Sequence, residues 1–384
     1  MNILIAPNAF KHGVNAGDAA LAIREGLTQS KLEGAFEYFP VGDGGDGTGS
    51  LIVSKSNGIH VNAVAHDPLK RKIHASFGLI DAGKTAVIEM ATASGLHQLQ
   101  RNELNPMQAT SMGTGELITD AMDKGARKII IGMGGSATVD GGMGILKALG
   151  FRFLSAGGKD ISLPGDLMDL FSIDSSGIDR RIRKCEVIVL CDVDNKLLGK
   201  QGAAAVFGPQ KGASDSEVPI LDAGLSRLSE VILSQTGKNI AALKYGGTAG
   251  GAAAGLCGLL NAKLVNGINY FLELTGFDLA LQKCDLVITG EGSIDDQTTK
   301  GKGPFGVARR AKLNGLPVIG IAGKVPLNPD PVLQLYFDAL IPIGHEPLDM
   351  ATALAFTENN LIRTSREIGN LLALSNIIGI KGFY

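Results

Sequence analysis

Residues 2–7 (NILIAP) form a short apolar run near the start of the chain. Apolar residues at helical spacing follow over Ala16–Leu27, and a second apolar run covers Ala35–Val41 (AFEYFPV). A strand, a helix and a strand in this order predict the opening of a doubly wound parallel sheet. The same rhythm returns near the C-terminus, where three further apolar runs indicate buried strands: Asp285–Thr289 (DLVIT), Pro317–Ile321 (PVIGI) and Ala339–Ile343 (ALIPI).

The middle of the chain has a different pattern. Apolar and polar residues alternate over His60–Ala65 and Lys72–Leu79, and Thr85–Met90 adds another strand, which together predict an antiparallel meander. We therefore expect an α/β fold with two α/β domains. Residues 1–64 and 270–384 would form a discontinuous, doubly wound domain of Rossmann or flavodoxin type, and residues 65–269 an inserted α/β domain.

Composition excludes several classes of protein. The 384 residues are 45% hydrophobic with a formal net charge of -2, and they contain no basic run of the kind that binds nucleic acid. The four cysteines form no CxxC pair, the six histidines show no zinc-binding spacing, and no apolar stretch is long enough to span a membrane. We expect a cytoplasmic protein without nucleic-acid or membrane partners. The oligomeric state stays open, and a homodimer is one alternative.

The first of four glycine-framed acidic loops is Gly42–Thr48 (GDGGDGT), which follows the second predicted strand. Asp43 and Asp46, with Thr48 at a helix start, suit Mg²⁺ or substrate hydroxyls. The glycines also fit GxGxxG, with Asp67 about 20 residues later, so a dinucleotide site is an alternative. A plain glycine turn with capping aspartates is another.

The second loop is Gly132–Gly142 (GMGGSATVDGG), between a predicted strand and a helix. Backbone N–H groups of such a turn can hold a phosphate. Hydroxyl groups and a carboxylate lie beside them, so the expected phosphate- and substrate-binding residues are Gly134, Gly135, Ser136, Thr138 and Asp140. The alternative is a turn in which the polar side chains only cap the helix.

Two more acidic loops follow predicted strands. In Cys191–Asn195 (CDVDN), Asp192 at the strand's end is the preferred functional residue, although an Asx-turn would also explain the motif. In Gly290–Gln297 (GEGSIDDQ), Glu291 and Asp295 are the candidates. Positive charge comes next, from Lys300 and Lys302, of which Lys302 is the better candidate for binding a phosphate or carboxylate.

Other cations complete the inventory. Lys11 follows the first strand, as a phosphate-binding lysine would, although the chain contains no Walker GxxxxGK[ST] motif. Lys211 (in FGPQKG) and Arg71 (in DPLKRK) are candidates to hold a carboxylate. Carboxylates, N–H turns and lysines without a Ser–His or cysteine nucleophile are typical of phosphoryl transfer, which depends on positioning and charge neutralisation.

Nine ordered strings resemble the bacterial glycerate kinase family over nearly the whole chain: APNAFK, DGGDGT, IEMATASGL, GTGEL, GGSATVDGG, CDVDN, GAAAVFGPQKGA, DLVITGEGSID and GKGPFGVA. The resemblance implies ATP-dependent phosphorylation of D-glycerate to 2-phosphoglycerate with Mg²⁺. It also implies two α/β domains with the active site in the cleft between them. Four positions in three motifs depart from the usual pattern: Asn8 and Ala9 replace Asp and Ser, Asp46 replaces Glu, and Val139 replaces Asn.

These observations lead to a mechanistic hypothesis. ATP phosphates would lie on the backbone of Gly134–Ser136, with Lys11 as a catalytic lysine, and the acidic loops with a nearby cation would hold glycerate. The proton acceptor would be Asp192 or Asp295, and Asp43 and Asp192 would be the Mg²⁺ ligands. Two alternatives stay open, namely a nicotinamide-dependent oxidoreductase and a non-catalytic nucleotide or sugar-acid sensor. The sequence does not decide between phosphorylation at the 2- and the 3-position.

Overall fold

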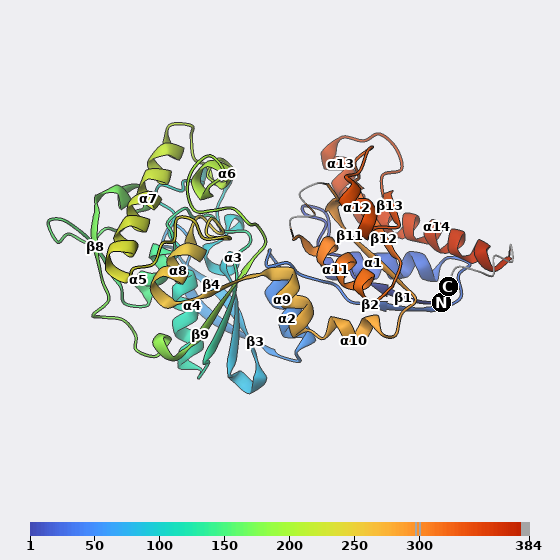
Figure 1. Ribbon diagram of the computed structural model, residues 1–384, viewed down its shortest axis with the longest axis horizontal. Helices are drawn as coiled ribbons and strands as arrows, with labels where there is room; N and C mark the ends of the chain where they lie inside the picture. Colours follow the sequence, from blue (N-terminus) through green and yellow to red (C-terminus); the bar gives the residue numbers. More distant parts are fainter. Residues whose placement is uncertain (296–297, 299–300, 378–384) are drawn as a thin grey trace. The chain divides into compact units, whose positions relative to one another are not determined.

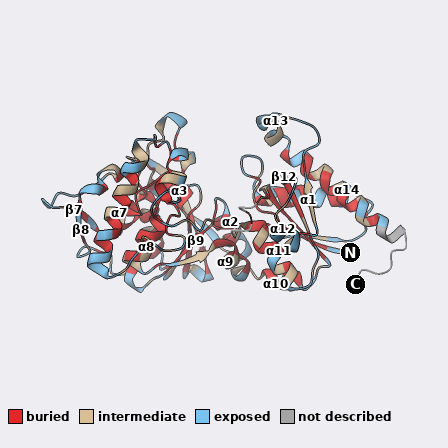
Figure 2. Ribbon diagram, turned by 45° about the horizontal axis from the view of Figure 1, so that its top comes forward, coloured by how far each residue is buried: buried red, intermediate tan, exposed pale blue. Residues whose placement is uncertain are grey.

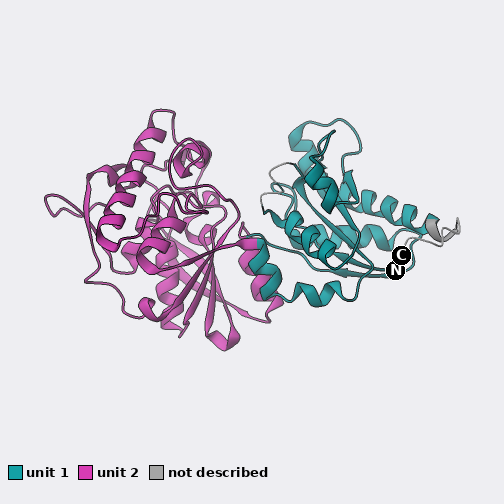
Figure 3. Cartoon of the chain, viewed as in Figure 1, with its two compact units in different colours: residues 1–43, 268–384 teal, residues 44–267 magenta. Residues whose placement is uncertain are grey.

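The computed structural model describes residues 1–295, 298 and 301–377. The chain divides into two compact units, which are Met1–Asp43 with Ile268–Tyr384 (unit 1) and Gly44–Gly267 (unit 2) (Figure 3). From the sequence, we predicted the first domain boundary after residue 64. In the structure, β3 (Ile59–His66) pairs antiparallel with β4 (Lys72–Ile80) along its whole length, so this strand is an integral part of the unit 2 sheet.

Unit 1 contains a five-stranded sheet in which every pairing is parallel (Figure 1). Its strands lie in the order β13-β12-β11-β1-β2. Their bounds are β1 (Asn2–Ile5), β2 (Ala35–Tyr38), β11 (Leu286–Ser293), β12 (Val318–Lys324) and β13 (Ala339–Pro342). Counted within the sheet, this is the flavodoxin-like order 2-1-3-4-5. The predicted doubly wound α/β fold is therefore confirmed.

The helices of unit 1 are α1 (Ala16–Thr28), α9 (Gly267–Leu274), α10 (Phe277–Leu281), α11 (Gly303–Leu313), α12 (Pro331–Tyr336), α13 (Met350–Ala355) and α14 (Thr357–Ile377). Helix α1 packs against α14, and the two approach closely because a Cβ at Gly26 would lie only 2.2 Å from the Ile362 carbonyl oxygen. Ile3, Ile5 and Ile288 belong to the core that these helices cover. Helix α11 packs against β11 and β12.

Unit 2 contains a six-stranded mixed sheet in the order β10-β9-β6-β5-β4-β3. The bounds of the strands not yet given are β5 (Thr85–Glu89), β6 (Lys128–Gly132), β9 (Glu186–Cys191) and β10 (Lys263–Asn266). The β3–β4 and β4–β5 pairings are antiparallel, as the meander predicted, and the remaining pairings are parallel. A separate hairpin consists of β7 (Arg152–Ser155) and β8 (Leu170–Asp174).

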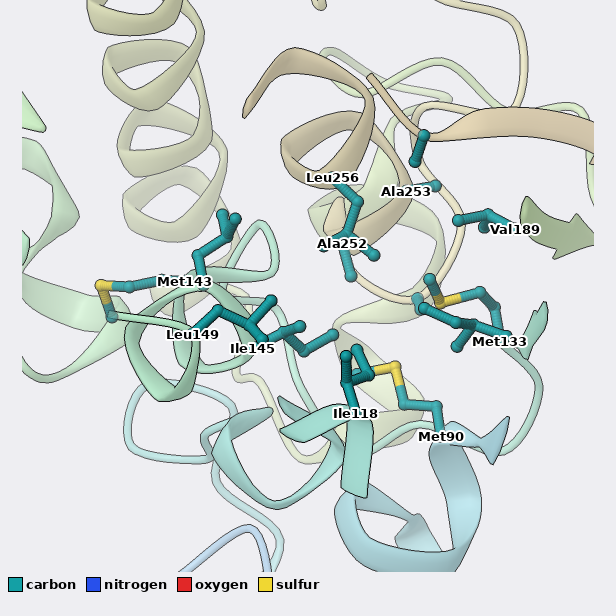
Figure 4. Packing of buried hydrophobic residues seen from close by; sticks show 14 of the residues in the cluster. Met90, Ile118, Met133, Met143, Ile145, Leu149, Val189, Ala252, Ala253 and Leu256 are labelled. Carbon is teal, nitrogen blue, oxygen red and sulfur yellow. The ribbon is translucent and has the colours of Figure 1, made fainter. Parts of the chain in front are cut away.

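The helices of unit 2 are α2 (Thr48–Lys55), α3 (Met90–Ser94), α4 (Met112–Asp123), α5 (Met143–Ala148), α6 (Ala203–Phe207), α7 (Glu217–Thr236) and α8 (Ala252–Leu260). Buried residues line the strands and the inner helix faces of each unit (Figure 2). In the unit 2 core, Met90 and Met133 lie near Ile118, while small residues of α8 such as Ala252 permit close packing (Figure 4). Among the described residues, no helix is long and apolar enough to cross a membrane.

Candidate functional site

The carboxyl ends of β1 and β11 form the switch point of the unit 1 sheet, where folds of this order bind ligands. The chain leaves β1 through Asn8, whose N–H donates to the Gly290 carbonyl oxygen at 2.8 Å. Asn8 therefore lies just after β1, beside Glu291 near the carboxyl end of the neighbouring strand β11. Both are buried, as is Asp43. These three residues are the centre of what we call the switch-point cluster, which also includes Lys11 and Lys302.

Asp43 is held by donors from two other segments of unit 1. Its Oδ2 accepts a hydrogen bond from Asn8 Nδ2 at 2.8 Å and one from the Gly303 N–H at 3.4 Å. A Cβ at Gly303 would lie 2.7 Å from Asn8 Nδ2, so a side chain there would displace Asn8. The Asn8 departure thus has a structural role, since the amide donates where an ionised aspartate could only accept.

Glu291 is a second buried carboxylate in this cluster. Its Oε1 accepts a hydrogen bond from Thr298 Oγ1 at 3.0 Å. Burial raises the pKa of Glu291 to about 7, and the charge of Asp43 adds to the rise, while Lys302 and Lys11 oppose it. A carboxyl group with this pKa can exchange a proton near neutral pH, as a general base must.

Asp295 lies in the turn after β11. Its Oδ2 accepts a hydrogen bond from Ser293 Oγ at 3.1 Å, and its backbone N–H donates to Thr298 Oγ1 at 3.0 Å. Thr298 therefore links this turn to Glu291. Gln297, at the end of the fourth loop, and Lys300, one source of the positive charge that follows it, lie outside the described residues.

In unit 2, two of the predicted glycine loops pack directly on each other. The Gly134 N–H donates to the Gly44 carbonyl oxygen at 3.0 Å. A Cβ at Gly134 would lie 2.4 Å from the Gly45 Cα, and Gly44 has a φ of +96°. Side chains are therefore sterically excluded from this contact, which explains the glycines without any reference to a dinucleotide.

Thr48 and Glu89 stabilise the start of α2. Thr48 Oγ1 accepts a hydrogen bond from the Gly44 N–H at 3.0 Å. Glu89 ends β5, and backbone N–H groups at the start of α2 point to its carboxylate. Burial raises the pKa of Glu89 above its usual value, and the charge of Asp46 adds to the rise. Glu89 Oε1 is buried without a hydrogen-bond partner in the described part of the chain. The sequence did not single out Glu89, which lies among the apolar residues of IEMATASGL.

The loop between β6 and α5 (residues 133–142, the β6–α5 loop) is held by a buried lysine. Lys211 Nζ donates to Ser136 Oγ at 2.9 Å and to the Thr138 carbonyl oxygen at 2.7 Å. Burial lowers the pKa of Lys211 to about 7, against the opposing charges of Asp140 and Asp192. Thr138 Oγ1 is buried and has no hydrogen-bond partner among the described residues.

Asp140 organises the same loop from within. Its carboxylate is fully buried and accepts hydrogen bonds from Ser111 N–H, Ser111 Oγ, Gly142 N–H and Gly144 N–H, at 2.6–3.0 Å. These four donors occupy both carboxylate oxygens, so Asp140 positions the loop. Val139, the departure beside it, is fully buried in the hydrophobic core.

The remaining predicted residues are spread over the two units. Arg71 forms ion pairs with Asp67 and Glu103, so its guanidinium already holds two carboxylates of unit 2. Asp192 is half-buried at the end of β9, whereas Asp43 belongs to unit 1. Among the residues with described positions, no group of three or more Asp, Glu, His or Cys side chains could enclose a metal ion.

Comparison with known proteins identifies the family. A family model described as the glycerate kinase family matches residues 3–373. The chain belongs to the glycerate kinase family. A glycerate kinase of Bacillus subtilis is 44% identical over 377 residues, covering 98% of both chains. A glycerate 2-kinase of Escherichia coli is 40% identical, covering 97% of this chain and 98% of the other.

A solved structure supports the same assignment. A crystal structure from Salmonella typhimurium LT2, assigned as a glycerate kinase 2, matches with a TM-score of 0.82 and 40% identity, covering 98% of this chain and 99% of that chain. Membership of the glycerate kinase family confirms the resemblance found in the sequence motifs. It supports a phosphotransferase, and it does not support the oxidoreductase or the sensor alternative.

Proposed function

We propose that this protein transfers the γ-phosphoryl group of ATP to D-glycerate and that the product is 2-phosphoglycerate. The glycerate kinase relatives support the reaction, and the E. coli relative, named a glycerate 2-kinase, supports the position. The observation within the chain that carries the proposal is the packing of the Gly44–Gly45 segment on Gly134. This contact presents a side-chain-free backbone turn of the kind that binds phosphate.

The ATP phosphates would lie on the backbone of Gly134–Ser136. The Gly134 N–H is already bound to the Gly44 carbonyl oxygen, so the N–H groups of Gly135 and Ser136 are the candidate donors. Gly135 has a φ of +68°, and alternating right- and left-handed backbone conformations turn successive N–H groups toward one anion. Arg71, with its guanidinium engaged elsewhere, would contribute less to binding than the sequence suggested.

Glycerate would bind at the switch-point cluster. Lys11 and Lys302 supply positive charge for its carboxylate, and both charges act on Glu291. Asp43 and Glu291 supply acceptors for its hydroxyl groups. The proton acceptor would be Asp192 or Asp295, as the sequence suggests, and the raised pKa of Glu291 adds this residue as a third candidate.

Magnesium is expected with the nucleotide. Mg²⁺ usually binds through one or two carboxylates together with substrate phosphates, so a site without three acidic ligands still fits it. Glu89, with its buried Oε1 lacking a partner in the described structure, and the adjacent Asp46 are suitable ligands beside the glycine loops. Asp43 and Asp192 remain the sequence-based candidates. When bound, Mg²⁺ would neutralise charge on the phosphates.

A coupled assay of ADP formation tests this function. The purified protein with MgATP should form ADP only when D-glycerate is added. Equal ADP formation with and without D-glycerate would overturn the proposal. The cytoplasmic location, the lack of nucleic-acid partners, a homodimer and an active site in an interdomain cleft remain predictions.

A further inference from the structure

We propose that Lys211 is the positioning residue that prepares the β6–α5 loop for the phosphates of a nucleotide, and that it acts through the hydroxyl group of Ser136. The inference rests on the proposed function, which it extends by assigning a buried residue to nucleotide binding. The sequence had suggested Lys211 as a residue that holds a carboxylate.

The geometry ties the loop to a distant segment. Lys211 is only 3% exposed, and it ends the 3-10 helix Pro209–Lys211. Its ammonium group donates to the Ser136 side chain and to the Thr138 backbone, which lie two residues apart in the β6–α5 loop. These two hydrogen bonds fix both the path of the loop and the orientation of the Ser136 hydroxyl group.

The cost of burying the Lys211 ammonium outweighs the stabilisation that nearby carboxylates give it. Asp140 and Asp192 are the carboxylates whose charges act on it. Asp140 accepts hydrogen bonds from Ser111, Gly142 and Gly144, and no ion pair of the described residues includes Lys211. A buried ammonium group is costly unless an anion is near. An anion bound near Ser136 would stabilise the ammonium form of Lys211 further.

The direction of the hydrogen bond from Lys211 to Ser136 shows how the lysine could act on a bound ligand through the Ser136 hydroxyl group. Ser136 Oγ accepts from Lys211, so the Ser136 hydroxyl hydrogen remains available to donate. Ser136 itself is buried, whereas the neighbouring Gly135 is exposed. A chain from ammonium to hydroxyl to anion is strengthened at each step by polarisation.

The class of anion follows from the other donors. The buried Thr138 hydroxyl lacks a partner among the described residues, and the backbone at Gly135 takes the left-handed conformation of an anion-binding turn. Several hydroxyl and backbone N–H donors around one turn suit the oxygen atoms of a phosphate group. The carboxylate of glycerate is the competing occupant, and the experiment separates the two.

The experiment compares three variants. Lys211→Met removes the charge, Ser136→Ala removes the hydroxyl group through which it would act, and Lys159→Met, in an exposed turn of unit 2, is the control. Titration calorimetry with a non-hydrolysable ATP analogue gives the nucleotide Kd, and steady-state kinetics give the KM for D-glycerate. We expect Lys211→Met to weaken nucleotide binding about 10-fold or more, Ser136→Ala several-fold, and the control by less than about 2-fold.

The double variant tests whether Lys211 acts through Ser136. Its nucleotide Kd should be close to that of Lys211→Met alone, since two residues in one chain of hydrogen bonds do not act additively. The KM for D-glycerate should change by less than about 2-fold in every variant that retains activity. Fully multiplicative losses would contradict the proposed route through Ser136.

Other outcomes have distinct meanings. A raised KM for D-glycerate with an unchanged nucleotide Kd would overturn the inference in favour of a carboxylate site. Unchanged values for both would leave Lys211 with a purely structural role and would also overturn it. If Lys211→Met fails to fold, Ser136→Ala decides by the same criteria. A wild-type protein that binds the ATP analogue without phosphorylating glycerate would refute the proposed function alone.

Discussion

Asn8 Nδ2 donates a 2.8 Å hydrogen bond to Asp43 Oδ2 within unit 1, and both side chains are buried. The motif departure at position 8 is therefore part of the switch-point cluster. An amide at this position satisfies Asp43 without a second negative charge. Glu291 is already destabilised in its ionised form by Asp43, so a neutral residue 8 limits the repulsion within the cluster.

We expect Asn8→Ala to destabilise the protein by about 1–3 kcal/mol, because a buried carboxylate oxygen loses its amide donor. The KM for D-glycerate should also rise. Chemical denaturation and steady-state kinetics measure the two effects. Asn62→Ala, at an exposed position on β3, is the control and should change stability by less than about 0.5 kcal/mol. Equal effects in both variants would argue against a special role for Asn8.

Gly134→Ala should weaken nucleotide binding about 10-fold or more, because its Cβ would collide with the Gly45 backbone and separate the two loops. Gly157→Ala is a matched control, since Gly157 has open space around it and no positive φ. Calorimetry with an ATP analogue gives the comparison. Normal nucleotide binding by Gly134→Ala would show that the packed loops do not form the phosphate site.

The stability of the protein should depend on pH through Lys211. The unfolded chain keeps the Lys211 proton up to its ordinary pKa of 10.5, whereas the folded protein releases it near pH 7. Between these values the unfolded state binds more protons, so the free energy of unfolding rises with pH. Lys211→Met removes this contribution, and its stability relative to wild type should be higher at pH 6.5 than at pH 9, by about 2 kcal/mol.

Denaturation curves of both proteins at the two pH values measure this difference. The comparison is between two pH values for one substitution, so the change in packing caused by methionine largely cancels. A relative stability independent of pH would show that Lys211 titrates normally in the folded protein.

Replacement of each candidate base identifies the proton acceptor. Asp192→Asn, Asp295→Asn and Glu291→Gln preserve side-chain shape and remove the basic oxygen. The residue that accepts the substrate proton should lose about 10²-fold or more in kcat, and the others should lose less. Near wild-type kcat in all three variants would exclude these carboxylates as the base.

The sequence predicted the strands of the unit 1 sheet well, because the central strands β1, β11 and β12 are mostly buried and form near-continuous apolar runs. It did not predict α14, whose partner α1 lies more than 300 residues away in the chain. The site was predicted less completely. The motif around Lys211 does not indicate that its ammonium reaches Ser136, which lies 75 residues earlier. Glu89 was missed because its polar neighbours belong to the start of α2.

The central claim is that the protein phosphorylates the 2-hydroxyl group of D-glycerate. Phosphorus NMR of the product formed from MgATP and D-glycerate tests it most directly, with enolase added afterwards in the absence of a mutase. The product should be 2-phosphoglycerate, which enolase converts at once to phosphoenolpyruvate. A product that enolase leaves unchanged would contradict phosphorylation at the 2-position, and the absence of any phosphorylated glycerate would contradict the claim as a whole.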